Sequence, residues 1–411
     1  MFFKVKTTEE VFDLIRAFSP AGEETVYIED SLGLVLSKDI VSPENLPGFS
    51  RSSMDGYAVN AKDTFGATES MPAFLELAGE VQMGQNPDVR YSQGRAIKIS
   101  TGGMLPAGTD GVVMLEYCHD LDENTIEVSR AISPLENVIS PGDDFKENAV
   151  VFEAGSRMRP QDIGLLAGLG ISNVSVYRRP KVAIISTGDE IVPIDKNPDP
   201  GQVRDINSYT LSAFCRQMGA EPTIMGLCAD DFSQLRDLME KSLAFADTVW
   251  VSGGSSVGTR DMTLKVLESF DDMELLVHGI SISPGKPTIV AKIGSRAVFG
   301  LPGHAASAMV IAEVFLREFL LYLLGSRSKN PINKSVKAEM SRNVESKSGR
   351  DDFIRVRIEK KGEKLLAVPV FGKSGLISTL VDAHGLVRID RNAEGVYQNQ
   401  VVDVMLFSNQ S

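Results

Sequence analysis

Cysteine is scarce in this chain of 411 residues. Its three cysteines include no CxxC pair: Cys118, Cys215 and Cys228. A disulfide framework needs more cysteines than this, and a thiolate zinc site needs them in closely spaced pairs. We therefore expect neither, and the composition fits a reducing cytosol.

Several catalytic motifs are missing as well. The sequence contains no GxxxxGK[ST] phosphate loop, no GxGxxG after its first buried strand and no GxSxG nucleophile turn. These absences argue against a P-loop enzyme, a dinucleotide-binding fold and a serine hydrolase. No two of the four histidines are paired at metal-ligand spacing: His119, His278, His304 and His384. Only His304 stands inside a loop of interest, GLPGHAASA.

Positive charge is in short supply. The formal net charge is −13 at pH 7, and an acidic chain lacks the basic surface that binding to a phosphate backbone needs. We expect no nucleic acid partner. The first residues, MFFKVKTTEE, contain no apolar core of a signal peptide, so we expect a cytoplasmic protein.

One apolar run is long enough to require a membrane test. Residues 305–324, AASAMVIAEVFLREFLLYLL, approach the length that spans a bilayer. Glu313, Arg317 and Glu318 lie in the middle of this run, and charges are costly there in lipid. The run therefore predicts a long, buried helix of a globular domain and no membrane contact.

The length predicts several domains, because one hydrophobic core rarely serves so many residues. A first helix is predicted where Thr7 and Glu10 match a capping box. The apolar residues that follow share one helical face: Val11, Leu14, Ile15 and Phe18. From about residue 45 to 145 the sequence has short strand-like runs between Gly and Pro residues, which indicates a compact β-rich domain.

Strand-like and helical runs alternate after residue 180. KVAIIST, PTIMGLC, DTVWVSGG and AVFGLPG have the character of buried strands, while NSYTLSAFCRQM, DDFSQLRDLMEKSLAF and TLKVLESF have the character of helices. This alternation predicts a parallel, doubly wound sheet. From about residue 328 the pattern is again β-like, so the fold class is α/β plus β.

Small residues gather after the predicted strands. Ligands of open parallel sheets bind beyond the carboxyl ends of the strands, and four stretches belong to this region: 186–190, 252–261, 283–287 and 300–303. Each loop by itself is best explained as a tight turn. Four such loops, with Lys286 as a point charge, favour an anion site that could cradle phosphates.

Carboxylates fall at the same strand ends and helix starts: Glu190, Asp205, Asp230 and Asp261. Each one alone is best explained as a helix cap or a solvated charge. Together they would repel a phosphate, and a hard divalent cation with oxygen ligands resolves that conflict. The sequence thus predicts Mg²⁺ together with a phosphate-bearing ligand.

The stretch LPGFSRSSMDGYAV, residues 46–59, is unusual for a turn because it combines an arginine, hydroxyls, a carboxylate and an aromatic ring. The chain also contains, in order, RPQDIGLLAGLG, RRPKVAIISTGDEIV, GQVRDINSYTL, SGGSSVGTRDM, SPGKPT, GLPGHAASA and SGRDDFIRVRI. This ordered set resembles the molybdopterin molybdenumtransferase family, the bacterial MoeA type that also forms the C-terminal half of gephyrin. The resemblance runs almost from end to end.

The resemblance implies an elongated, multidomain subunit that forms a homodimer. It implies a discontinuous linker domain (1–44 with 146–178), a β-rich inserted domain (45–145), a doubly wound molybdopterin-binding domain (179–327) and a C-terminal β-barrel-like domain (328–411). The doubly wound domain is similar to that of the enzyme that adenylylates molybdopterin. The loop around Asp55 is expected to face the doubly wound domain of the dimer partner.

The implied reaction takes adenylylated molybdopterin and molybdate, inserts molybdenum between the dithiolene sulfurs and releases AMP, assisted by Mg²⁺. The implied catalytic residues are Asp55, Thr101, Asp144, Glu190, Asp230 and Asp261, of which Glu190, Asp230 and Asp261 would also hold the metal. The implied substrate-binding residues are Ser252, Gly253, Gly254, Ser255, Lys286, Pro302, His304, Arg350 and Ser374. Protein partners would be the adenylyltransferase and the molybdoenzyme apoproteins.

The chain departs from the family pattern at a few positions. Ser50 stands where aspartate is usual, Ser283 stands where a basic residue is common, and GLPGHAAS replaces GLPGNPVS, so that His304 and Ala305 take the places of asparagine and proline. Two other functions stay open, a molybdopterin adenylyltransferase and a non-catalytic molybdopterin-binding scaffold. Tungstate stays open as the metal oxyanion.

Overall fold

The computed structural model describes residues 5–253, 257–326 and 335–407, without the side chains of 257–261. The chain forms two compact units. The first unit comprises residues 1–38, 155–159 and 173–411, and the second comprises residues 39–154 and 160–172. The predicted division into four domains, with its boundaries, stays a prediction.

A six-stranded sheet forms the centre of the first unit. Its order is β17 (Glu221–Cys228), β14 (Lys181–Thr187), β18 (Thr248–Ser252), β22 (Arg296–Leu301), β21 (Ile289–Ile293) and β19 (Met273–His278). The first four strands are parallel, as predicted. The prediction of an all-parallel sheet is wrong for β21 and β19, which run antiparallel to their neighbours. Only residues 294–295 join β21 to β22, and so short a connection makes a hairpin, whereas parallel neighbours need a crossover.

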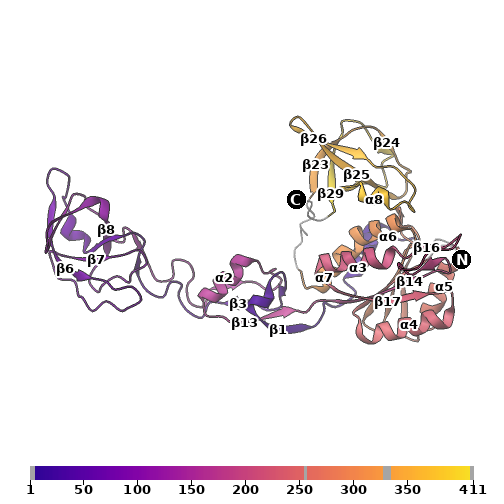
Figure 1. Cartoon of the computed structure of the whole chain (residues 1–411), viewed down its shortest axis with the longest axis horizontal. Coiled ribbons are helices and arrows are strands. Elements are labelled where there is room, and N and C mark those ends of the chain that lie inside the picture. The colour runs from indigo at the N-terminus through magenta and orange to yellow at the C-terminus, as the bar shows by residue number, and fades with distance from the viewer. Residues whose placement is uncertain (1–4, 254–256, 327–334, 408–411) are drawn as a thin grey trace. The chain divides into compact units, whose positions relative to one another are not determined.

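Helices cover both faces of this sheet, which makes it doubly wound (Figure 1). One face packs against α1 (Thr8–Ile15), α3 (Asn207–Met218), α6 (Ala305–Ile311) and α7 (Arg317–Leu323). The other face packs against α4 (Phe232–Phe245) and α5 (Val257–Leu267). Successive residues of β14 face opposite sides, so Ile184 joins the first core and Ile185 the second. The unbroken apolar run of this strand follows from burial on both faces.

The apolar run at 305–324 is a buried helix, as predicted. A π-helical segment, Ala312–Leu316, separates α6 from α7. Glu313 is only 6% exposed and forms an ion pair with Arg317 one turn later, which compensates the buried charge. Among the described residues, no helix is long and apolar enough to cross a membrane.

The C-terminal part of the first unit closes into a five-stranded barrel, which confirms the predicted barrel-like domain. The ring runs β25 (Asp351–Lys361), β26 (Lys364–Pro369), β23 (Ser335–Met340), β29 (Val401–Leu406), β27 (Gly385–Ile389) and back to β25. A short strand from the α/β part, β20 (Ile282–Ser283), pairs in parallel with β25. The smaller elements are β24 (Val344–Glu345), β28 (Gly395–Val396) and a short helix, α8 (Ser378–Val381).

Two small sheets complete the first unit. One has the order β1 (Glu23–Tyr27), β13 (Asn173–Tyr177) and β2 (Val35–Leu36), with a 3-10 turn at Ile28–Ser31. The other pairs β15 (Ile191–Val192) with β16 (Val203–Arg204) and lies directly after β14 in the chain. It therefore shapes the loop at the carboxyl end of that strand.

The second unit is β-rich, as predicted. Its main sheet has the order β8 (Gly111–Met114), β5 (Gly56–Val59), β7 (Arg95–Ile99), β6 (Ala73–Glu80), β10 (Thr125–Val128) and β9 (Cys118–Asp122). Two-stranded sheets join β4 (Arg51–Ser52) to β11 (Val138–Ile139) and β3 (Ile40–Val41) to β12 (Val150–Phe152). The remaining elements are α2 (Pro160–Gly168) and 3-10 turns at Ala61–Thr64 and Leu115–Tyr117.

The cysteines are free, as the sequence predicts. Cys215 and Cys228 are buried, and Cys118 is partly buried. Burial raises the pKa of the Cys118 thiol to about 12, so this side chain is protonated near neutral pH and is a poor metal ligand or nucleophile.

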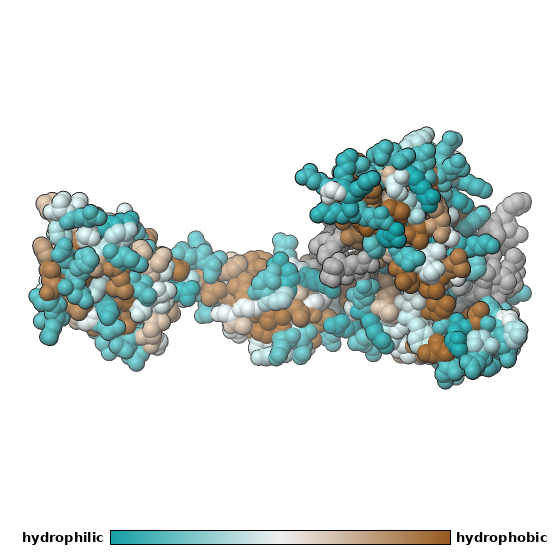
Figure 2. All heavy atoms as spheres, turned by 45° about the horizontal axis from the view of Figure 1, so that its top comes forward, coloured by the Kyte–Doolittle hydropathy of each residue, from teal (hydrophilic) through white to brown (hydrophobic). Residues whose placement is uncertain are grey.

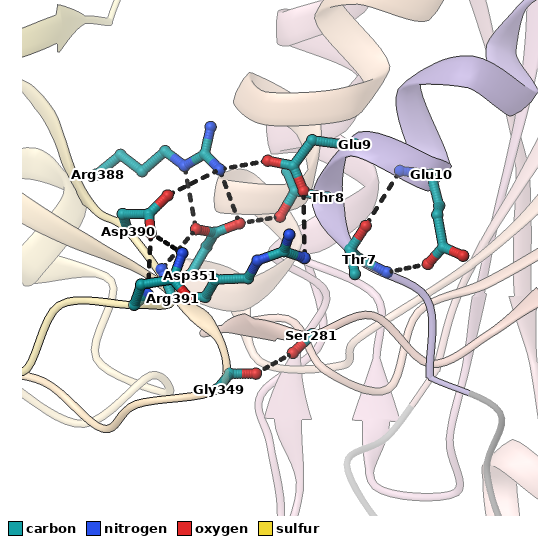
Figure 3. Close-up of polar contacts among 11 residues, drawn as sticks. Thr7, Thr8, Glu9, Glu10, Ser281, Gly349, Asp351, Arg388, Asp390 and Arg391 are labelled. Carbon is teal, nitrogen blue, oxygen red and sulfur yellow. Dashed lines mark hydrogen bonds and ion pairs between the residues drawn. The ribbon is translucent and has the colours of Figure 1, made fainter.

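A network of charges fixes the first helix to the barrel (Figure 3). Asp351 is 1% exposed and accepts hydrogen bonds from the Thr8 hydroxyl and the Arg388 guanidinium. Glu9 pairs with Arg388 at 2.6 Å and with Arg391 at 3.6 Å. The α1 residues thus reach a part of the chain more than three hundred positions away, and the network holds the barrel against the α/β part.

The capping box at the start of α1 is present as the sequence predicts, and it gives a stability test. The Thr7 hydroxyl accepts from the Glu10 amide at 3.2 Å, and the Glu10 carboxylate accepts from the Thr7 amide at 2.7 Å. Thr7→Ala removes the first bond and should cost about 1 kcal/mol of unfolding free energy. A thermal melt should show a lower midpoint for Thr7→Ala than for Thr7→Ser, which keeps the hydroxyl. Equal midpoints for these two variants would contradict the role of the cap.

Candidate active site

The carboxyl edge of the parallel strands is lined by polar groups that bond to one another. Ser186, the penultimate residue of β14, donates to the Asp205 carboxylate at 3.1 Å and lies 2.7 Å from the Ser208 hydroxyl. The same carboxylate oxygen accepts from the Ser208 amide at 3.1 Å. Asp205 is 6% exposed. Its bonds identify it as the carboxylate that holds the start of α3, which agrees with the helix-cap reading of the sequence.

Asn207 ties three loops of this edge together. Its side-chain amide donates to the Ser252 hydroxyl at 2.6 Å and to the Gly303 carbonyl at 2.8 Å. Ser252 ends β18, and Gly303 follows β22. One side chain therefore fixes the spacing of the loops after two neighbouring strands, and Ser252 takes its place at the edge with its hydroxyl already engaged.

Two glycines allow close packing at the edge. Gly188 has φ of +146°, and a Cβ there would lie 2.7 Å from the Glu190 carboxylate. A Cβ on Gly253 would lie 2.9 Å from the Thr187 hydroxyl. The positive φ of Gly188 and the close Thr187 hydroxyl at Gly253 disfavour a side chain at either position, so the backbone after β14 and β18 can approach a ligand closely.

Three acidic residues meet beyond β14 and β17. The Asp230 amide donates to the Asp189 carboxylate at 3.0 Å. Partial burial, followed by the negative charges of Asp189 and Glu190, raises the pKa of Asp230. One carboxylate oxygen of Asp230 is buried without a hydrogen-bond partner. A carboxylate that lacks a hydrogen-bond partner and lies beside other negative charges would be stabilised by a bound cation.

The fit to a metal is therefore good for part of the predicted set. Glu190 and Asp230 supply hard oxygen ligands of the kind that Mg²⁺ accepts. The side chain of Asp261, the third predicted ligand, lies outside the described residues. Within the described residues, no group of three or more His, Cys, Asp or Glu side chains is arranged to hold a metal ion. The metal assignment stays a prediction.

A cavity of about 330 Å³ opens at this edge. Glu190, Asn207 and His304 contribute to its wall, together with Gly375 from the C-terminal barrel domain. The His304 ring nitrogen Nδ1 lies 2.8 Å from the Ser374 hydroxyl, and the Ala306 amide donates to the Ser374 carbonyl at 3.1 Å. The loop that carries Ser374 thus closes one side of the cavity.

A second cavity of about 400 Å³ lies on the barrel side of that loop. Its lining includes Ser283, Arg350, Asp352, Arg355 and Ser374. The Arg350 Nε atom forms an ion pair with the Asp352 carboxylate at 2.9 Å. Ser374 therefore borders the second cavity, while its neighbour in the chain borders the first.

The remaining predicted residues of the first unit that the structure describes do not line either of these two cavities. Lys286 is exposed in the turn between β20 and β21, and no described cavity is lined by it. Pro302 is buried directly after β22. Gly254 and Ser255 lie outside the described residues.

The predicted residues of the second unit lie on adjoining loops. The Asp55 carboxylate accepts hydrogen bonds from the Thr101 amide at 2.7 Å and the Thr101 hydroxyl at 3.0 Å. These two bonds lower the pKa of Asp55 and keep it ionised. The Asp144 amide donates to the Leu46 carbonyl at 3.0 Å, which places Asp144 beside the start of the unusual stretch. The structure brings Asp55 and Thr101 into contact, and Asp144 is exposed on the neighbouring loop.

The sequence did not single out three residues of the candidate site: Asn207 and Arg355, which line the cavities, and Asp189, which contacts Asp230. Asn207 lies inside the motif GQVRDINSYTL, at the start of a predicted helix. This position at a helix start could have indicated that its side chain contacts a neighbouring loop. Asp189 adjoined Glu190 in the TGDE run. Arg355 had no signal beyond its position in a strand, because only the tertiary structure shows which face of β25 borders a cavity.

Three family models match the chain in order. They are the MoeA N-terminal region (domain I and II) at residues 6–170, the "Probable molybdopterin binding domain" at 183–322 and the MoeA C-terminal region (domain IV) at 337–407. Together they span almost all of the sequence, including both units.

Individual relatives match over nearly their full length. The molybdopterin molybdenumtransferase of Haemophilus influenzae is 32% identical over 393 residues, which cover 95% of this chain and 95% of that protein. A Methanocaldococcus jannaschii protein named for molybdopterin biosynthesis is 34% identical over 93% of this chain and 91% of its own length. The crystal structure of a molybdopterin biosynthesis MoeA protein from Pyrococcus horikosii is similar with a TM-score of 0.85, at 36% identity, over 99% of this chain and 100% of that one.

The acid cluster predicts how stability changes with pH. Because the folded state raises the pKa of Asp230 above 3.8, the group binds its proton more tightly when folded. Its contribution to stability is therefore full at low pH and is lost as the pH rises through the folded-state pKa. Asp230→Asn removes this loss, so without metal its melting temperature should exceed that of the natural protein at neutral pH and match it more closely in acid.

The control for this test is Asp195→Asn, an exposed acid on the loop after β15. It should follow the pH dependence of the natural protein. Thermal melts in chelator across this pH range make the comparison. An Asp230→Asn variant with an unchanged pH dependence would contradict the strained-acid interpretation.

Proposed function

Since the chain belongs to the MoeA family, we propose that it is a molybdopterin molybdenumtransferase of molybdenum cofactor biosynthesis. It takes adenylylated molybdopterin and molybdate, transfers molybdenum to the pterin dithiolene and releases AMP. The reaction takes place in the cytoplasm. The observation that carries the proposal is that two cavities meet at the loop of Ser374, one lined by Glu190, Asn207 and His304 and the other by Arg350 and Arg355.

The adenylate phosphates bind at the carboxyl edge of the parallel sheet. Gly253 has no side chain to block the end of β18, and Ser252 is held in place by Asn207. The predicted residues Gly254 and Ser255 lie outside the described residues. His304 and Gly303 line the cavity at this edge, and Pro302 is buried directly before them. The placement follows the general rule that ligands of such sheets bind beyond the carboxyl ends of the strands.

Mg²⁺ would be held by Glu190, Asp230 and Asp261. When bound, the ion neutralises the negative charge that develops where the phosphates meet these carboxylates. The protein holds the Asp230 carboxylate in a place where one of its oxygens has no hydrogen-bond partner. Its pKa is raised there by partial burial and by the neighbouring acids. Such a carboxylate binds a cation with little rearrangement.

The metal oxyanion binds in the arginine-lined cavity. Arg350 and Ser374 border it. Lys286, in the turn that follows β20, is outside this lining. Guanidinium and hydroxyl groups are suitable donors for a tetrahedral oxyanion. Molybdate and tungstate have this shape in common, so both are substrates to be compared.

A homodimer completes the site with Asp55, Thr101 and Asp144 of a second copy. Asp55 is exposed and ionised, so it is ready to meet a ligand from outside its own unit. Exposed apolar side chains on and after β1 support association between copies, with Tyr27 at 53% and Leu32 at 52% exposure. Figure 2 shows hydrophobic surface gathered over the segment that contains β1 and β13.

Two alternatives have less support. A molybdopterin adenylyltransferase would need only the doubly wound part, whereas the family matches include the N-terminal and C-terminal regions of the transferases. A scaffold would have no need for the contact between Asp55 and Thr101 or for the acid cluster at Asp230. We expect the adenylyltransferase to supply the substrate, and molybdoenzyme apoproteins to receive the product.

The deciding experiment follows AMP release. The purified protein is incubated with adenylylated molybdopterin and Mg²⁺, with and without molybdate, and AMP is separated by chromatography. Molybdate-dependent release is expected, and tungstate is compared in parallel. Tight binding of the adenylate, with no AMP released in the presence of either molybdate or tungstate, would contradict the transferase function. It would favour a non-catalytic scaffold.

A second prediction concerns the shared site. Asp55→Asn and Glu190→Gln should each abolish most AMP release while leaving the melting temperature close to that of the natural protein. A mixed dimer of the two variants contains one site with both residues intact, because each residue comes from a different subunit. Co-expressed and purified mixed dimers should therefore recover part of the activity. No recovery in verified mixed dimers would show that the two residues act within one subunit or independently.

A further inference from the structure

The two arginines of the arginine-lined cavity differ in how their charge is compensated. The Nε atom of Arg350 lies 2.9 Å from Oδ1 of Asp352, an ion-pair distance, although neither atom makes a hydrogen bond. The Arg350 Nη2 atom donates to the other Asp352 oxygen at 3.5 Å, and Asp352 is only 5% exposed. Asp352 also accepts from the Ser346 hydroxyl at 2.6 Å. A buried carboxylate held this closely neutralises most of the charge of its partner. Arg350 therefore offers hydrogen-bond donors to an incoming anion, but little net charge.

Arg355 lacks such a partner. Its Nη2 atom donates to the Gly372 carbonyl at 2.9 Å, while its Nη1 atom is buried without a hydrogen-bond partner. No described carboxylate forms an ion pair with it. Burial alone lowers the pKa of Arg355, so the cost of desolvation is not balanced by a neighbouring negative charge. An uncompensated, partly buried guanidinium beside a cavity of about 400 Å³ is a binding group for an anion.

We propose that Arg355 supplies the net positive charge that binds the metal oxyanion in this cavity. This inference rests on the proposed function and assigns to its oxyanion site a residue outside the predicted set. The ligand class is a tetrahedral dianion that is attracted by the uncompensated charge of Arg355, with Ser374 and Arg350 as hydrogen-bond donors from the same lining. Asp352 and Glu345, the acids of the lining, limit the affinity for it.

The second bond of Arg355 connects anion binding to the rest of the site. Gly372 lies in the loop that carries Ser374, and Ser374 contacts His304 at the edge of the other cavity. Arg355 thus holds the loop between the two cavities with Nη2, while the charge of its guanidinium remains without a carboxylate partner among the described residues. A test has to separate the charge from the loop contact.

The test compares four variants in two measurements. Equilibrium dialysis gives the dissociation constant for molybdate alone, and AMP release gives KM for molybdate and kcat. Arg355→Gln removes the charge and retains an amide donor for the Gly372 carbonyl, and Arg355→Lys retains the charge without the planar fork. The matched control is Arg357→Gln, on the same strand, where the exposed guanidinium is paired with Glu359 at 3.0 Å. Asp352→Asn removes the acid that compensates Arg350.

Arg355→Gln should weaken molybdate binding and raise KM for molybdate by about tenfold or more, since a charge-assisted interaction is lost. Arg355→Lys should lie between this variant and the natural protein, and Arg357→Gln should match the natural protein. Asp352→Asn should bind molybdate more tightly, which keeps the proposal testable if Arg355→Gln does not fold. Affinity for the pterin adenylate should stay unchanged in Arg355→Gln.

Three results would overturn the inference. They are an unchanged dissociation constant and KM in Arg355→Gln, weaker binding of the pterin adenylate with unchanged molybdate binding, and no gain in Asp352→Asn. The second result would assign the cavity to the adenylate phosphate. Failure of the proposed function is separate, because it would appear as no molybdate-dependent AMP release by the natural protein itself.

Discussion

The buried carboxylate of Asp351 is the interaction on which the arrangement of the first unit depends. A carboxylate that is 1% exposed is stable only when several donors satisfy it. Here they come from the first helix through Thr8, and from the barrel through the Arg388 side chain and the Arg391 amide (Figure 3). Removing any one donor leaves a buried charge poorly compensated, so these parts of the chain are held as one structure.

The backbone of the same residue places the arginine-lined cavity. The Asp351 amide donates to the Ser281 carbonyl at 3.0 Å, and the Ser281 hydroxyl donates to the Gly349 carbonyl at 2.6 Å. These bonds pair β20 with the start of β25, so that Ser283 lies opposite Asp352. The cavity lining on either side of this pairing therefore comes from the α/β part and from the barrel, and neither part would form it alone.

The acidic and basic side chains of the candidate site lie in different places. Acidic groups collect beyond β14 and β17, where Asp230 keeps one oxygen without a partner, and arginines collect on the barrel side of the Ser374 loop. The proposed cation and oxyanion would then not compete for one set of ligands. The contact between His304 and Ser374 is the boundary between the two environments.

The sequence alone determined the local elements and the inventory of chemical groups. The capping box at Thr7, the helix at Asn207–Met218 and the buried character of residues 305–324 follow from periodicity and capping, which are local properties. The ordered motifs indicated the family, because each one is a contiguous run of residues. Four strands were correctly predicted to be parallel, while β21 and β19 were not, since the direction of a strand is set by the length of its connections and by its neighbours.

Only the tertiary structure decided which of these groups are free to act. Asp205 and Asp230 both follow the same kind of pattern in the sequence, yet Asp205 is satisfied by Ser186 and Ser208 while Asp230 is left with an orphaned oxygen. Arg350 belongs to a conspicuous motif and lies against the Asp352 carboxylate, whereas Arg355 is inconspicuous and has no carboxylate partner among the described residues. Compensation of a charge depends on partners from distant parts of the chain, and the residue type alone does not reveal them.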